Sequence, residues 1–451
     1  MRKRISAFFS VLAAIVLLTV PASAASSGST LKIICADAGQ VIFTPPGSTQ
    51  YAYRYGPAIL IDGDRIDIWA SAPPLVSNGV RYGNDSIEYI RSTDGGKTWT
   101  EWKTVLYPTL NSEDQWSTCD PGAFKYGDYY YVGYTGSPEF RTNPDKEKQV
   151  NNLFIARAKN PEGPYEKWNG NGWGGDPYAI TRYSGDGVGC SMPSFTVKGD
   201  TLYMYYVDQT HPDQDWNSEG NISVSTFSLK DPNWPGNELS NKMCENKPEE
   251  VRYCPDIDKF IGFQLKGGWD YDSYVEIYES TDGVNFTKTS SFRNNFPHYA
   301  HNIGISGNNL GQLDLSIQNY IGTAYTPTGV EAWWGHWHTQ LIPLYIREEQ
   351  PSPTTSSQPS GSTDSSSQKP TTSSVGSTDG KSSETEVSEP QNSNIESTVS
   401  DDKDKDKEVN NKTEQQEETS YLWLYIVIGA VVVLAGAGTA VYFLVIKKKH
   451  V

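Results

Sequence analysis

Short runs of apolar and aromatic residues, separated by tight turns, recur along the chain from about residue 30 to residue 347. In the third run, PSFTVKGDTLYMYYVD, an apolar strand reaches Gly199-Asp200 and an aromatic strand follows. Glycine supplies the positive φ that a two-residue hairpin turn requires, so the run predicts a β-hairpin. No convincing amphipathic helix interrupts the pattern. We therefore expect an all-β domain.

One spacing repeats, in which a proline is followed six residues later by Gly-Asp or a near match. The copies begin, in chain order, at Pro57, Pro121, Pro193, Pro255 (degenerate) and His301 (with histidine in the place of proline). The second strands read RIDIWAS, YYYVGYTG, TLYMYYVD and, in the last copy, QLDLSIQ. About four short strands in each of five units predict a five-bladed β-propeller. An irregular β-sandwich with coincidental spacing is the less favoured alternative.

Two further patterns support a closed ring of sheets. The sequence STDGGKTW at residues 92–99, with a weaker copy STDGVNF at 280–286, matches the Asp-box of propeller turns, in which Ser and Asp bind the turn backbone. Its role is structural, so we do not expect Asp94 to be catalytic. A propeller is usually closed by pairing the two ends of the chain. LKIICADAG at residues 31–39 is the expected partner of HTQLIPLYI near the other end.

The two ends of the chain differ in composition from the repeats. Residues 1–24, with a basic start, an apolar stretch and Ala-Ser-Ala, predict a signal peptide. Residues 348–420, rich in Ser, Thr, Pro and acidic side chains, predict a disordered linker. Residues 421–446 predict a transmembrane helix, and the lysine-rich residues 447–451 a cytoplasmic tail. We expect a single-pass protein of the cell membrane with the propeller, residues 25–347, outside the cell.

The charge and the cysteine content limit the partners. The net charge is −17 at pH 7 and no basic cluster occurs in the repeats, which argues against nucleic acid. Calcium or a carbohydrate is easier to accommodate. Five cysteines are too few for a disulfide framework. Cys244 and Cys254 are close enough in sequence to pair, although spacing alone does not establish a bond.

Three segments, DPGAFKYGDYYYVGYTG, MPSFTVKGDTLYMYYVD and ARAKNPEGPYEKW, resemble five-bladed β-propeller glycoside hydrolases of the arabinanase and β-xylosidase type. The resemblance covers roughly residues 40–347. It implies three carboxylates around an axial funnel: an Asp before a blade proline as base, a second Asp, and a Glu near Gly-Pro as acid. Because Asp-boxes are more typical of six-bladed sialidases, a sialidase-like propeller is the nearest alternative.

Only part of this carboxylate pattern is present. Asp120 precedes Pro121 and is the candidate catalytic residue, whereas the corresponding positions elsewhere are Gly56, Met192 and Cys254. The Glu of a Glu-Gly-Pro motif is missing. Other carboxylates that could complete the set are Asp186, Asp256 and Glu276.

The same motif, Arg-Tyr-X-Pro, stands in two repeats. It predicts that Arg54, Tyr55, Arg252 and Tyr253 meet at the axial end, with Asp256 also binding substrate. Two converging arginines suit a bidentate grip on a carboxylate or sulfate, which suggests an anionic sugar. The open alternative is that each arginine forms a salt bridge within an acidic domain.

Histidine and tryptophan residues supply the remaining candidates. In the resembled family a blade-five histidine lies near a central calcium or its waters, which implies calcium at His301, with His298 binding substrate. A packed, hydrogen-bonded histidine is the alternative. Flat aromatic faces suit the C–H faces of sugars, so a stacking platform is a hypothesis for Trp69, Trp116 and Trp216, against ordinary blade packing.

Two functions remain from the sequence. One is a cell-surface glycoside hydrolase acting on a polysaccharide or oligosaccharide, with Asp120 as a catalytic carboxylate. The other is a non-catalytic carbohydrate-binding propeller, or adhesin, on a membrane stalk. The missing Glu-Gly-Pro favours the second, whereas the preserved Asp-Pro and the resemblance favour the first, which we prefer.

Overall fold

The computed structural model describes residues 29–46, 52–138, 140–143, 146–182, 188–210, 220–328 and 335–349, without the side chains of residues 140–149. The predicted signal peptide, linker, transmembrane helix and cytoplasmic tail lie outside these residues. Within the described ranges, no helix has the length and apolar character needed to cross a membrane.

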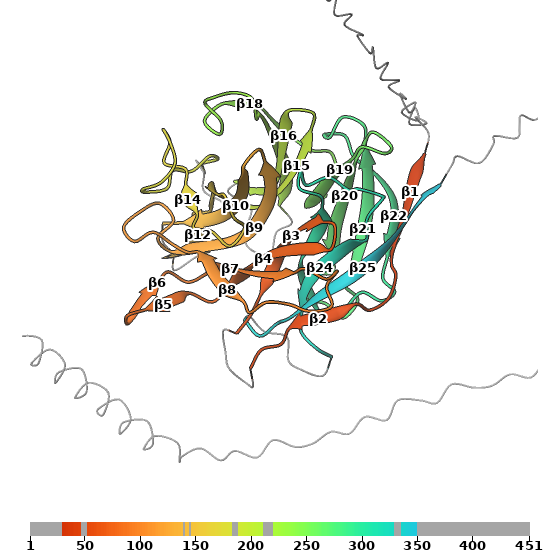
Figure 1. Ribbon diagram of the computed structural model, residues 1–451, viewed down its shortest axis with the longest axis horizontal. Coiled ribbons are helices and arrows are strands. Elements are labelled where there is room, and N and C mark those ends of the chain that lie inside the picture. Colours follow the sequence, from red (N-terminus) through yellow and green to blue (C-terminus); the bar gives the residue numbers. More distant parts are fainter. Residues whose placement is uncertain are drawn as a thin grey trace, which may run out of the picture. The chain divides into compact units, whose positions relative to one another are not determined.

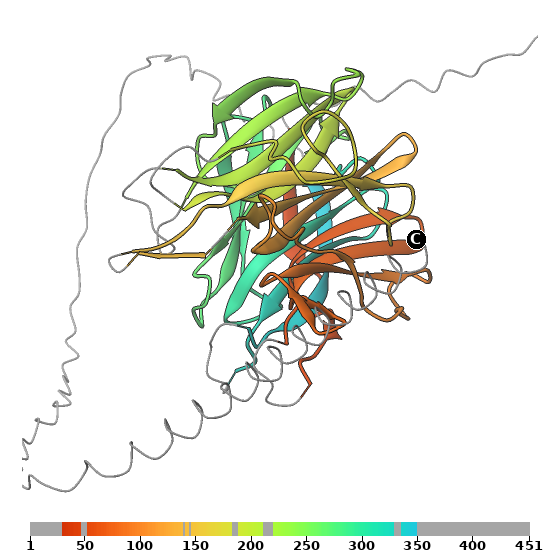
Figure 2. The same ribbon diagram turned by 90° about the vertical axis from the view of Figure 1, so that its left-hand side faces the viewer.

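The described residues form five antiparallel sheets of four strands, two of which are joined edge to edge (Figures 1 and 2). Sheet 1 contains β3 (Tyr55–Asp62), β4 (Arg65–Ala72), β7 (Ser86–Ser92) and β8 (Lys103–Leu106). Sheet 2 contains β9 (Ser117–Tyr126), β10 (Tyr129–Ser137), β13 (Asn152–Ala158) and β14 (Glu166–Lys167). Sheet 3 contains β15 (Gly189–Lys198), β16 (Thr201–Gln209), β17 (Asn221–Ser228) and β18 (Glu238–Met243).

Sheet 4 contains β19 (Glu250–Cys254), β20 (Lys259–Lys266), β21 (Tyr274–Ser280) and β22 (Thr287–Phe292). Sheet 5 combines β23 (Ala300–Gly307), β24 (Asn319–Tyr325) and β25 (His338–Glu349) with β1 (Thr30–Cys35), and β2 (Gln40–Phe43) also pairs with β25. Two small hairpins stand apart from the sheets: β5 (Leu75–Ser77) with β6 (Val80–Tyr82), and β11 (Phe140–Asn143) with β12 (Lys146–Gln149).

The innermost strands of the five sheets, β3, β9, β15, β19 and β23, contact one another in a closed cycle. β23 and β3 even pair in parallel, Ser306 with Ile59 and Gly307 with Leu60. A Cβ on Gly304 would lie 1.6 Å from the carbonyl oxygen of Pro57, so only glycine fits between these two strands. Five sheets arranged around one axis are the blades of a five-bladed β-propeller. The predicted fold class is confirmed for the described residues, and a sialidase-like sixth blade is not found among them.

Apolar side chains fill the spaces between neighbouring blades. The ring of Phe124 in blade 2 stacks on Tyr131, 4.9 Å between centroids, and packs against Phe195 of blade 3 at 5.2 Å. All three side chains are buried. The inner strands have a neighbouring blade on each face, so both of their faces are apolar. Their sequences are therefore continuous apolar runs instead of alternating ones.

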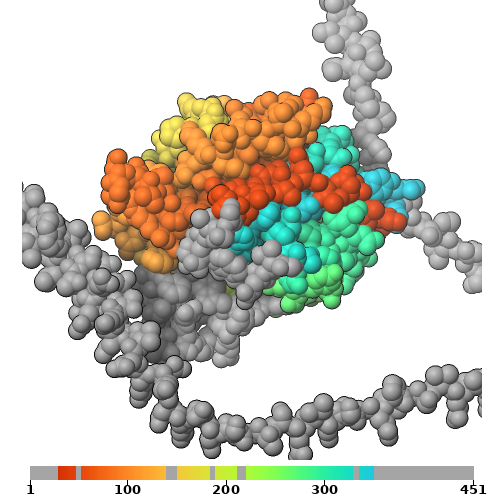
Figure 3. Space-filling view, turned by 90° about the horizontal axis from the view of Figure 1, so that it is seen from below, coloured from red at the N-terminus to blue at the C-terminus, as the bar shows by residue number. Residues whose placement is uncertain are grey.

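The N-terminal strand closes the ring. β1 is the outer partner of β25, with Ile33 opposite Ile346 and Cys35 opposite Leu344. Figures 1 and 3 show the red N-terminal residues beside the cyan C-terminal residues of this blade. Alternate β1 side chains, Leu31, Ile33 and Cys35, are buried. The predicted pairing of residues 31–39 with the last strand is confirmed.

The connection between β23 and β24 does not form the strand expected for QLDLSIQ. Instead, residues 308–315, which we call the axial plug, cross one end of the axis. Their backbone joins three other blades through the hydrogen bonds Lys125 N–H to Asn309 O (2.5 Å), Val197 N–H to Leu310 O (3.0 Å) and Leu313 N–H to Tyr253 O (2.9 Å). Leu313 is fully buried in the resulting cluster. The apolar residues of this segment face the axis, which explains why their pattern resembled a strand.

Pro255 does not occupy the position predicted from the repeat. The inner strand of blade 4, β19, ends at Cys254, and Pro255 lies in the turn that leads to β20. This turn corresponds to Gly63-Asp64 in blade 1, at the far end of the strand from Pro57. The prediction that Pro255 begins a repeat is therefore wrong. Proline and aspartate are common in turns as well as at strand entries, so the local sequence did not distinguish the two.

Both Asp-boxes have the predicted structural role. In the first, Ser92 Oγ donates to Asp94 Oδ1 (2.8 Å), and Asp94 Oδ1 accepts a hydrogen bond from Thr98 N–H (2.9 Å). The hydrogen bonds from Thr98 lower the pKa of Asp94 to about 2. In the second box, Ser280 and Asp282 bind the turn in the same way, 2.9 Å apart. Each box joins the third and fourth strands of a blade.

All five cysteines are described, buried and present as free thiols. The suggested bond between Cys244 and Cys254 is therefore not formed in this structure.

Ring closure by β1 predicts different effects of two neighbouring substitutions. Ile33 is 1% exposed, whereas Ile34 is 38% exposed. We expect Ile33→Ala to lower the free energy of unfolding by about 2–5 kcal/mol, because it leaves a cavity between β1 and the core. Ile34→Ala in the same strand should change it by less than about 0.5 kcal/mol. Chemical denaturation of both variants tests this, and equal effects would contradict the role given to β1.

The axial plug predicts a second matched pair. Gly311 and Gly63 both have positive φ, +66° and +62°. A Cβ on Gly311 would lie 2.4 Å from Phe195 O, whereas a Cβ on Gly63 would meet nothing within 4 Å. Gly63→Ala should cost about 1–2 kcal/mol of stability for its backbone conformation alone. Gly311→Ala should cost about 1–3 kcal/mol more, because it also forces the plug off the axis. Thermal unfolding measures the difference, and equal losses would argue against a tightly seated plug.

Candidate functional site

The inner strands begin at one end of the axis, the entry end, and finish at the opposite turn end, which carries the plug. Four of them have an irregular register near the entry end. Each has one residue there with positive φ: Gly56 (+57°), Asp120 (+47°), Met192 (+57°) and Asn302 (+57°). Such bulges re-aim side chains and are over-represented next to active sites. Asn302 is thus the blade-five equivalent of Asp120. The proline position of this repeat falls on Ile303, so the prediction that it falls on His301 is wrong.

These four equivalent residues meet at the axis. Asn302 Nδ2 donates to Asp120 Oδ1 (3.4 Å) and lies 3.9 Å from Met192 Sδ. A Cβ on Gly56 would lie 3.5 Å from Asp120 Oδ1 and 3.6 Å from Asn302 Nδ2. Blades 1, 2, 3 and 5 therefore converge on the Asp120 carboxyl group, which lies at the centre of the entry end as the sequence predicted.

The surroundings of Asp120 change its acidity. Its backbone N–H donates to Ser71 Oγ of blade 1 (2.7 Å), which fixes the bulge. The Cys119 thiol lies 3.5 Å from Asp120 Oδ2. Burial raises the pKa of the Asp120 carboxyl to about 6, and the charge of nearby Asp85 adds to the rise. Asp120 is therefore partly protonated in the pH range in which an ordinary aspartate is fully ionised.

Asp85 is a second buried carboxyl near the site that the sequence analysis missed. It accepts hydrogen bonds from Tyr53 Oη (2.6 Å), Ser117 Oγ (2.9 Å) and Asn84 Nδ2 (3.1 Å). Burial raises the pKa of Asp85. Both of its carboxyl oxygens accept hydrogen bonds, so Asp85 joins the start of β7 to β9. Its charge contributes to the raised pKa of Asp120. It follows the β5–β6 hairpin, and nothing in the spacing of the repeats marks it.

An aromatic wall, which we define as Tyr55, His301, Trp337 and Trp269, extends from the axis beside Asp120. Tyr55 is buried in one cluster with Cys119 and Trp337. Its ring centroid lies 5.5 Å from that of His301, which lies 4.3 Å from that of Trp269. Trp337 is fully buried and 4.5 Å from His301. Tyr55 is buried and His301 is partly exposed, whereas Trp269 is 37% exposed. The part of the wall that a ligand can reach is therefore formed by His301 and Trp269, and flat aromatic surface near a carboxyl group suits a sugar ring.

The environment of His301 does not fit the calcium that the resemblance implied. Calcium takes oxygen ligands, whereas three aromatic rings pack around the His301 imidazole. Burial lowers the pKa of His301 to about 3, so its ring is neutral. In the described part of the chain, no group of three or more His, Cys, Asp and Glu side chains is placed to hold a metal ion.

The structure does not bring Arg54 and Arg252 together. Arg54 pairs with Glu88 (2.5 Å) and lies 4.6 Å over the ring of Phe43 in β2, towards the outer strands. Arg252 is 5% exposed on β19, where it pairs with Glu250 (2.8 Å). Its other contacts are Ser194 Oγ (2.7 Å) and the Ile305 carbonyl (2.6 Å). The expected shared grip on an anion is wrong, because each arginine is neutralised by its own glutamate.

Several other predicted residues lie away from Asp120. Tyr253 donates to Asp258 (2.7 Å), and Asp256 accepts from Leu315 N–H (3.1 Å); both contacts belong to the turn end. Their prediction rested on the misplaced repeat at Pro255. Glu276 is on the third strand of blade 4 and binds Lys288 and Tyr278.

The remaining candidates have mixed positions. His298 stacks on Tyr271, 3.8 Å between centroids, and contacts Arg293 in the connection that leads to β23. Trp116 precedes β9 at the entry end, and its carbonyl accepts from Asn84 N–H (2.6 Å). Trp69 is fully buried in blade 1 and is blade packing. Asp186 and Trp216 lie outside the described residues.

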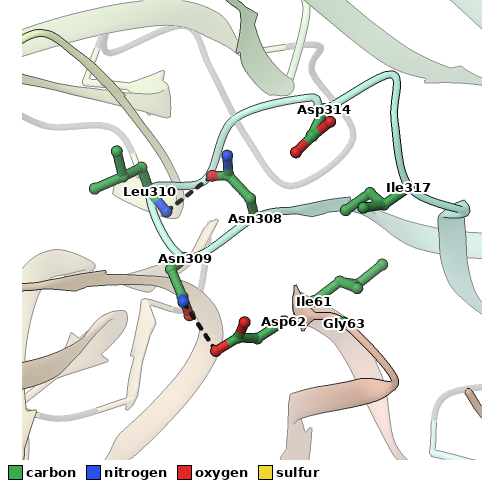
Figure 4. A pocket seen from close by; sticks show the side chains of 8 residues that line it. All are labelled: Ile61, Asp62, Gly63, Asn308, Asn309, Leu310, Asp314 and Ile317. Atoms are coloured by element: carbon green, nitrogen blue, oxygen red, sulfur yellow. Dashed lines mark hydrogen bonds between the residues drawn. The ribbon is translucent and has the colours of Figure 1, made fainter. Parts of the chain in front are cut away.

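A separate pocket of about 320 Å³ lies at the turn end between blades 1 and 5 (Figure 4). It is lined by the turn of blade 1 and the axial plug, and Asn309 Nδ2 donates to Asp62 Oδ2 (3.2 Å) across it. The plug crosses the axis at this turn end, whereas the Asp120 bulge lies at the opposite end. Asp120 is therefore approached from the entry end.

No family model matches the chain, and a search of curated proteins found no match. Solved structures to which it is similar include the catalytic domain of a GH62 α-L-arabinofuranosidase from Coprinopsis cinerea: 12% identity, TM-score 0.47, covering 70% of this chain and 98% of that one. A family 117 glycoside hydrolase from Zobellia galactanivorans is 14% identical, with a TM-score of 0.46, and the match covers 71% of this chain and 91% of that one. An α-L-arabinofuranosidase from Lactobacillus brevis is 13% identical, with a TM-score of 0.44, and the match covers 64% of this chain and 90% of that one. The group of enzymes that the sequence resembles is thus also represented among these structures, while the fold itself is assigned from the strand order.

The raised pKa of Asp120 predicts a pH-dependent stability difference. Its folded-state pKa of about 6 exceeds the usual 3.9, so the folded state retains the proton longer and loses stability as the pH rises from about 4 to above 6. Asp120→Asn should therefore be more stable than the wild type near pH 7.5, by up to about 3 kcal/mol, and lose this advantage near pH 4. Denaturant unfolding at both pH values measures it.

Asp176→Asn is the matched control, because it makes the same change in net charge at an exposed position. It should show no such pH-dependent gain. An Asp120→Asn advantage that stays constant between the two pH values would contradict the raised pKa.

Proposed function

We propose that the entry end binds a sugar and that the protein is a glycoside hydrolase acting on a polysaccharide or oligosaccharide. The observation that carries the proposal is the half-buried Asp120 carboxyl at the propeller axis, with its pKa raised to about 6 beside the aromatic wall. A carboxyl that holds its proton at mildly acidic pH can give that proton to the departing glycosidic oxygen. The exposed part of the aromatic wall supplies the flat surface on which the sugar is held during this step.

Glycoside hydrolysis requires a second carboxylate, either to attack the sugar directly or to activate water. Asp85 does not serve, because three hydrogen bonds hold its oxygens in the fold. Asp256 and Glu276 lie elsewhere in the propeller. We propose Asp186 for this role, because it shortly precedes β15 in the sequence and β15 begins at the entry end.

We propose a neutral sugar rather than an anionic one. An anionic sugar would require a cation near Asp120, and the two arginines suggested for it are paired with Glu88 and Glu250. The acidic net charge of −17 also disfavours a negatively charged polymer.

We further propose that the enzyme works at the cell surface. The composition of residues 1–24 and 421–446 supports export and a single C-terminal anchor. The polar linker, residues 348–420, would then hold the propeller away from the membrane, where polysaccharides are accessible.

A specific observation supports a second function, a non-catalytic carbohydrate-binding propeller. Of the four equivalent positions that meet at the axis, only Asp120 carries a carboxyl, and the others are Gly56, Met192 and Asn302. A site with one carboxyl group can bind a sugar. It lacks the second carboxyl group that glycoside hydrolysis requires.

Reducing-end release from a panel of neutral and uronate-containing glycans separates the two functions. We expect the wild type to hydrolyse at least one neutral glycan and Asp120→Asn to lose at least about 100-fold in kcat, because the proton donor is removed. The variant should still bind the glycan, as affinity electrophoresis can measure. Asp176→Asn is the control and should retain full activity. Binding by the wild type without any turnover would contradict the hydrolase and support the binding propeller.

A further inference from the structure

Trp269, in the loop between β20 and β21, combines two features that folding alone does not account for. Its backbone φ is +72°, a left-handed conformation that is a genuine outlier for a bulky residue. The side chain is also 37% exposed, so its burial contributes less to stability than that of a core tryptophan. Strained conformations cost of order 1–3 kcal/mol, persist where the surrounding structure fixes them, and cluster at active sites and ligand-binding sites.

The strained loop is held rigidly in place. Trp269 N–H donates to Ala300 O (2.9 Å), and Tyr299 N–H donates to Asp270 O (2.9 Å), so the loop is pinned to the residues that enter β23. The Ser273 hydroxyl, fully buried, donates to Gly267 O (2.8 Å) and accepts from Ala300 N–H (3.1 Å). These hydrogen bonds preorganise the loop before a ligand arrives.

The position of the ring indicates what it contacts. Trp269 packs against His301 and, 5.2 Å between centroids, against Trp337, so it forms the outer end of the aromatic wall. His301 and Tyr55 fill the space from Trp269 inwards to the Asp120 bulge. In the same loop, Tyr271 is 50% exposed and packs against His298 and Tyr299. A sugar chain with one unit at Asp120 would pass its next unit over the indole.

We infer that Trp269 is the stacking platform for a second sugar unit, and that the ligand is consequently a chain of at least two neutral sugars with unsubstituted C–H faces. The inference rests on the proposed function, because it assumes a carbohydrate at the entry end. An indole presents a large, rigid, apolar surface at a low cost in conformational entropy. The left-handed backbone directs this surface towards the axis instead of into the core.

Two variants at this one position separate the ring from the strain. Trp269→Ala removes the ring and keeps the strained backbone, whereas Trp269→Gly removes both, because glycine adopts positive φ freely. At an ordinary position a glycine variant is less stable than the alanine variant. Here we expect Trp269→Gly to melt at a higher temperature than Trp269→Ala. Both should bind the soluble neutral polysaccharide that the wild type prefers at least about 10-fold more weakly, as expected for the loss of an aromatic anchor.

Tyr345→Ala is the control for binding, because Tyr345 is an exposed aromatic residue (49%) on β25, opposite β1 and away from the entry end. It should bind as the wild type does. Affinities are measured by isothermal titration calorimetry with arabinoxylan, arabinan, xyloglucan and polygalacturonate, well below every melting temperature. If Trp269→Ala fails to fold, the glycine variant carries the binding test.

The outcomes distinguish this inference from the proposed function. If the wild type binds a polysaccharide and the Trp269 variants bind it equally well, the stacking platform is wrong and the proposed function stands. If Trp269→Gly melts below Trp269→Ala, the strain that led us to Trp269 is overturned. If the wild type binds none of the glycans, the proposed function falls and the platform falls with it.

Discussion

Backbone contact between the inner strands at the propeller axis is the constraint on which the other features depend. β23 lies against β3 so closely that a single methyl group at Gly304 would overlap the Pro57 carbonyl. The backbones of β3 and β23 therefore leave no gap between them. The plug crosses the turn end of the axis, and the guanidinium of Arg252 lies between β15 and β23. A buried charge of this kind is tolerated only when fully paired, and Glu250, a hydroxyl and backbone carbonyls supply the partners.

The same constraint explains why the functional residues gather at the entry end. Four inner strands carry a bulge in their register with the second strand of their own blade, at equivalent positions near the entry end. In blades 2, 3 and 5 the bulge turns the side chain of Asp120, Met192 or Asn302 into the space at the axis. Asp120 lies in that space, and its raised pKa follows from the exclusion of water by neighbours on three other blades. The acidity of the carboxyl is thus a consequence of how the ring is packed, and not of any single partner.

The sequence was a good guide to what short segments determine and a poor guide to what distant segments determine together. The hairpin turns of the first three repeats and the Asp-boxes are local patterns and were predicted correctly. The closing strand was also predicted correctly, because the ends of a propeller chain usually pair. The axial plug was mistaken for a strand because burial against the axis requires the same apolar residues as burial in a sheet. Asn302 was missed because its contact with Asp120 joins residues 182 positions apart. The pairing of two arginines failed because one repeat was read from a proline that belongs to a turn.

The geometry at Gly56 bears on how a catalytic pair could be built in this ring. An aspartate at position 56 would start from a Cβ only 3.5 Å from Asp120 Oδ1. Two carboxyl groups so close cannot both ionise, so they would share a proton instead of acting as separate acid and base. They would also be nearer than the roughly 5 Å that a retaining hydrolase uses. A second catalytic carboxylate therefore has to come from a loop above the entry end rather than from an equivalent bulge. Because the bulges of blades 3 and 5 carry Met192 and Asn302, the ring itself is built to hold one titrating group, and any hydrolytic activity depends on what the loops bring to it.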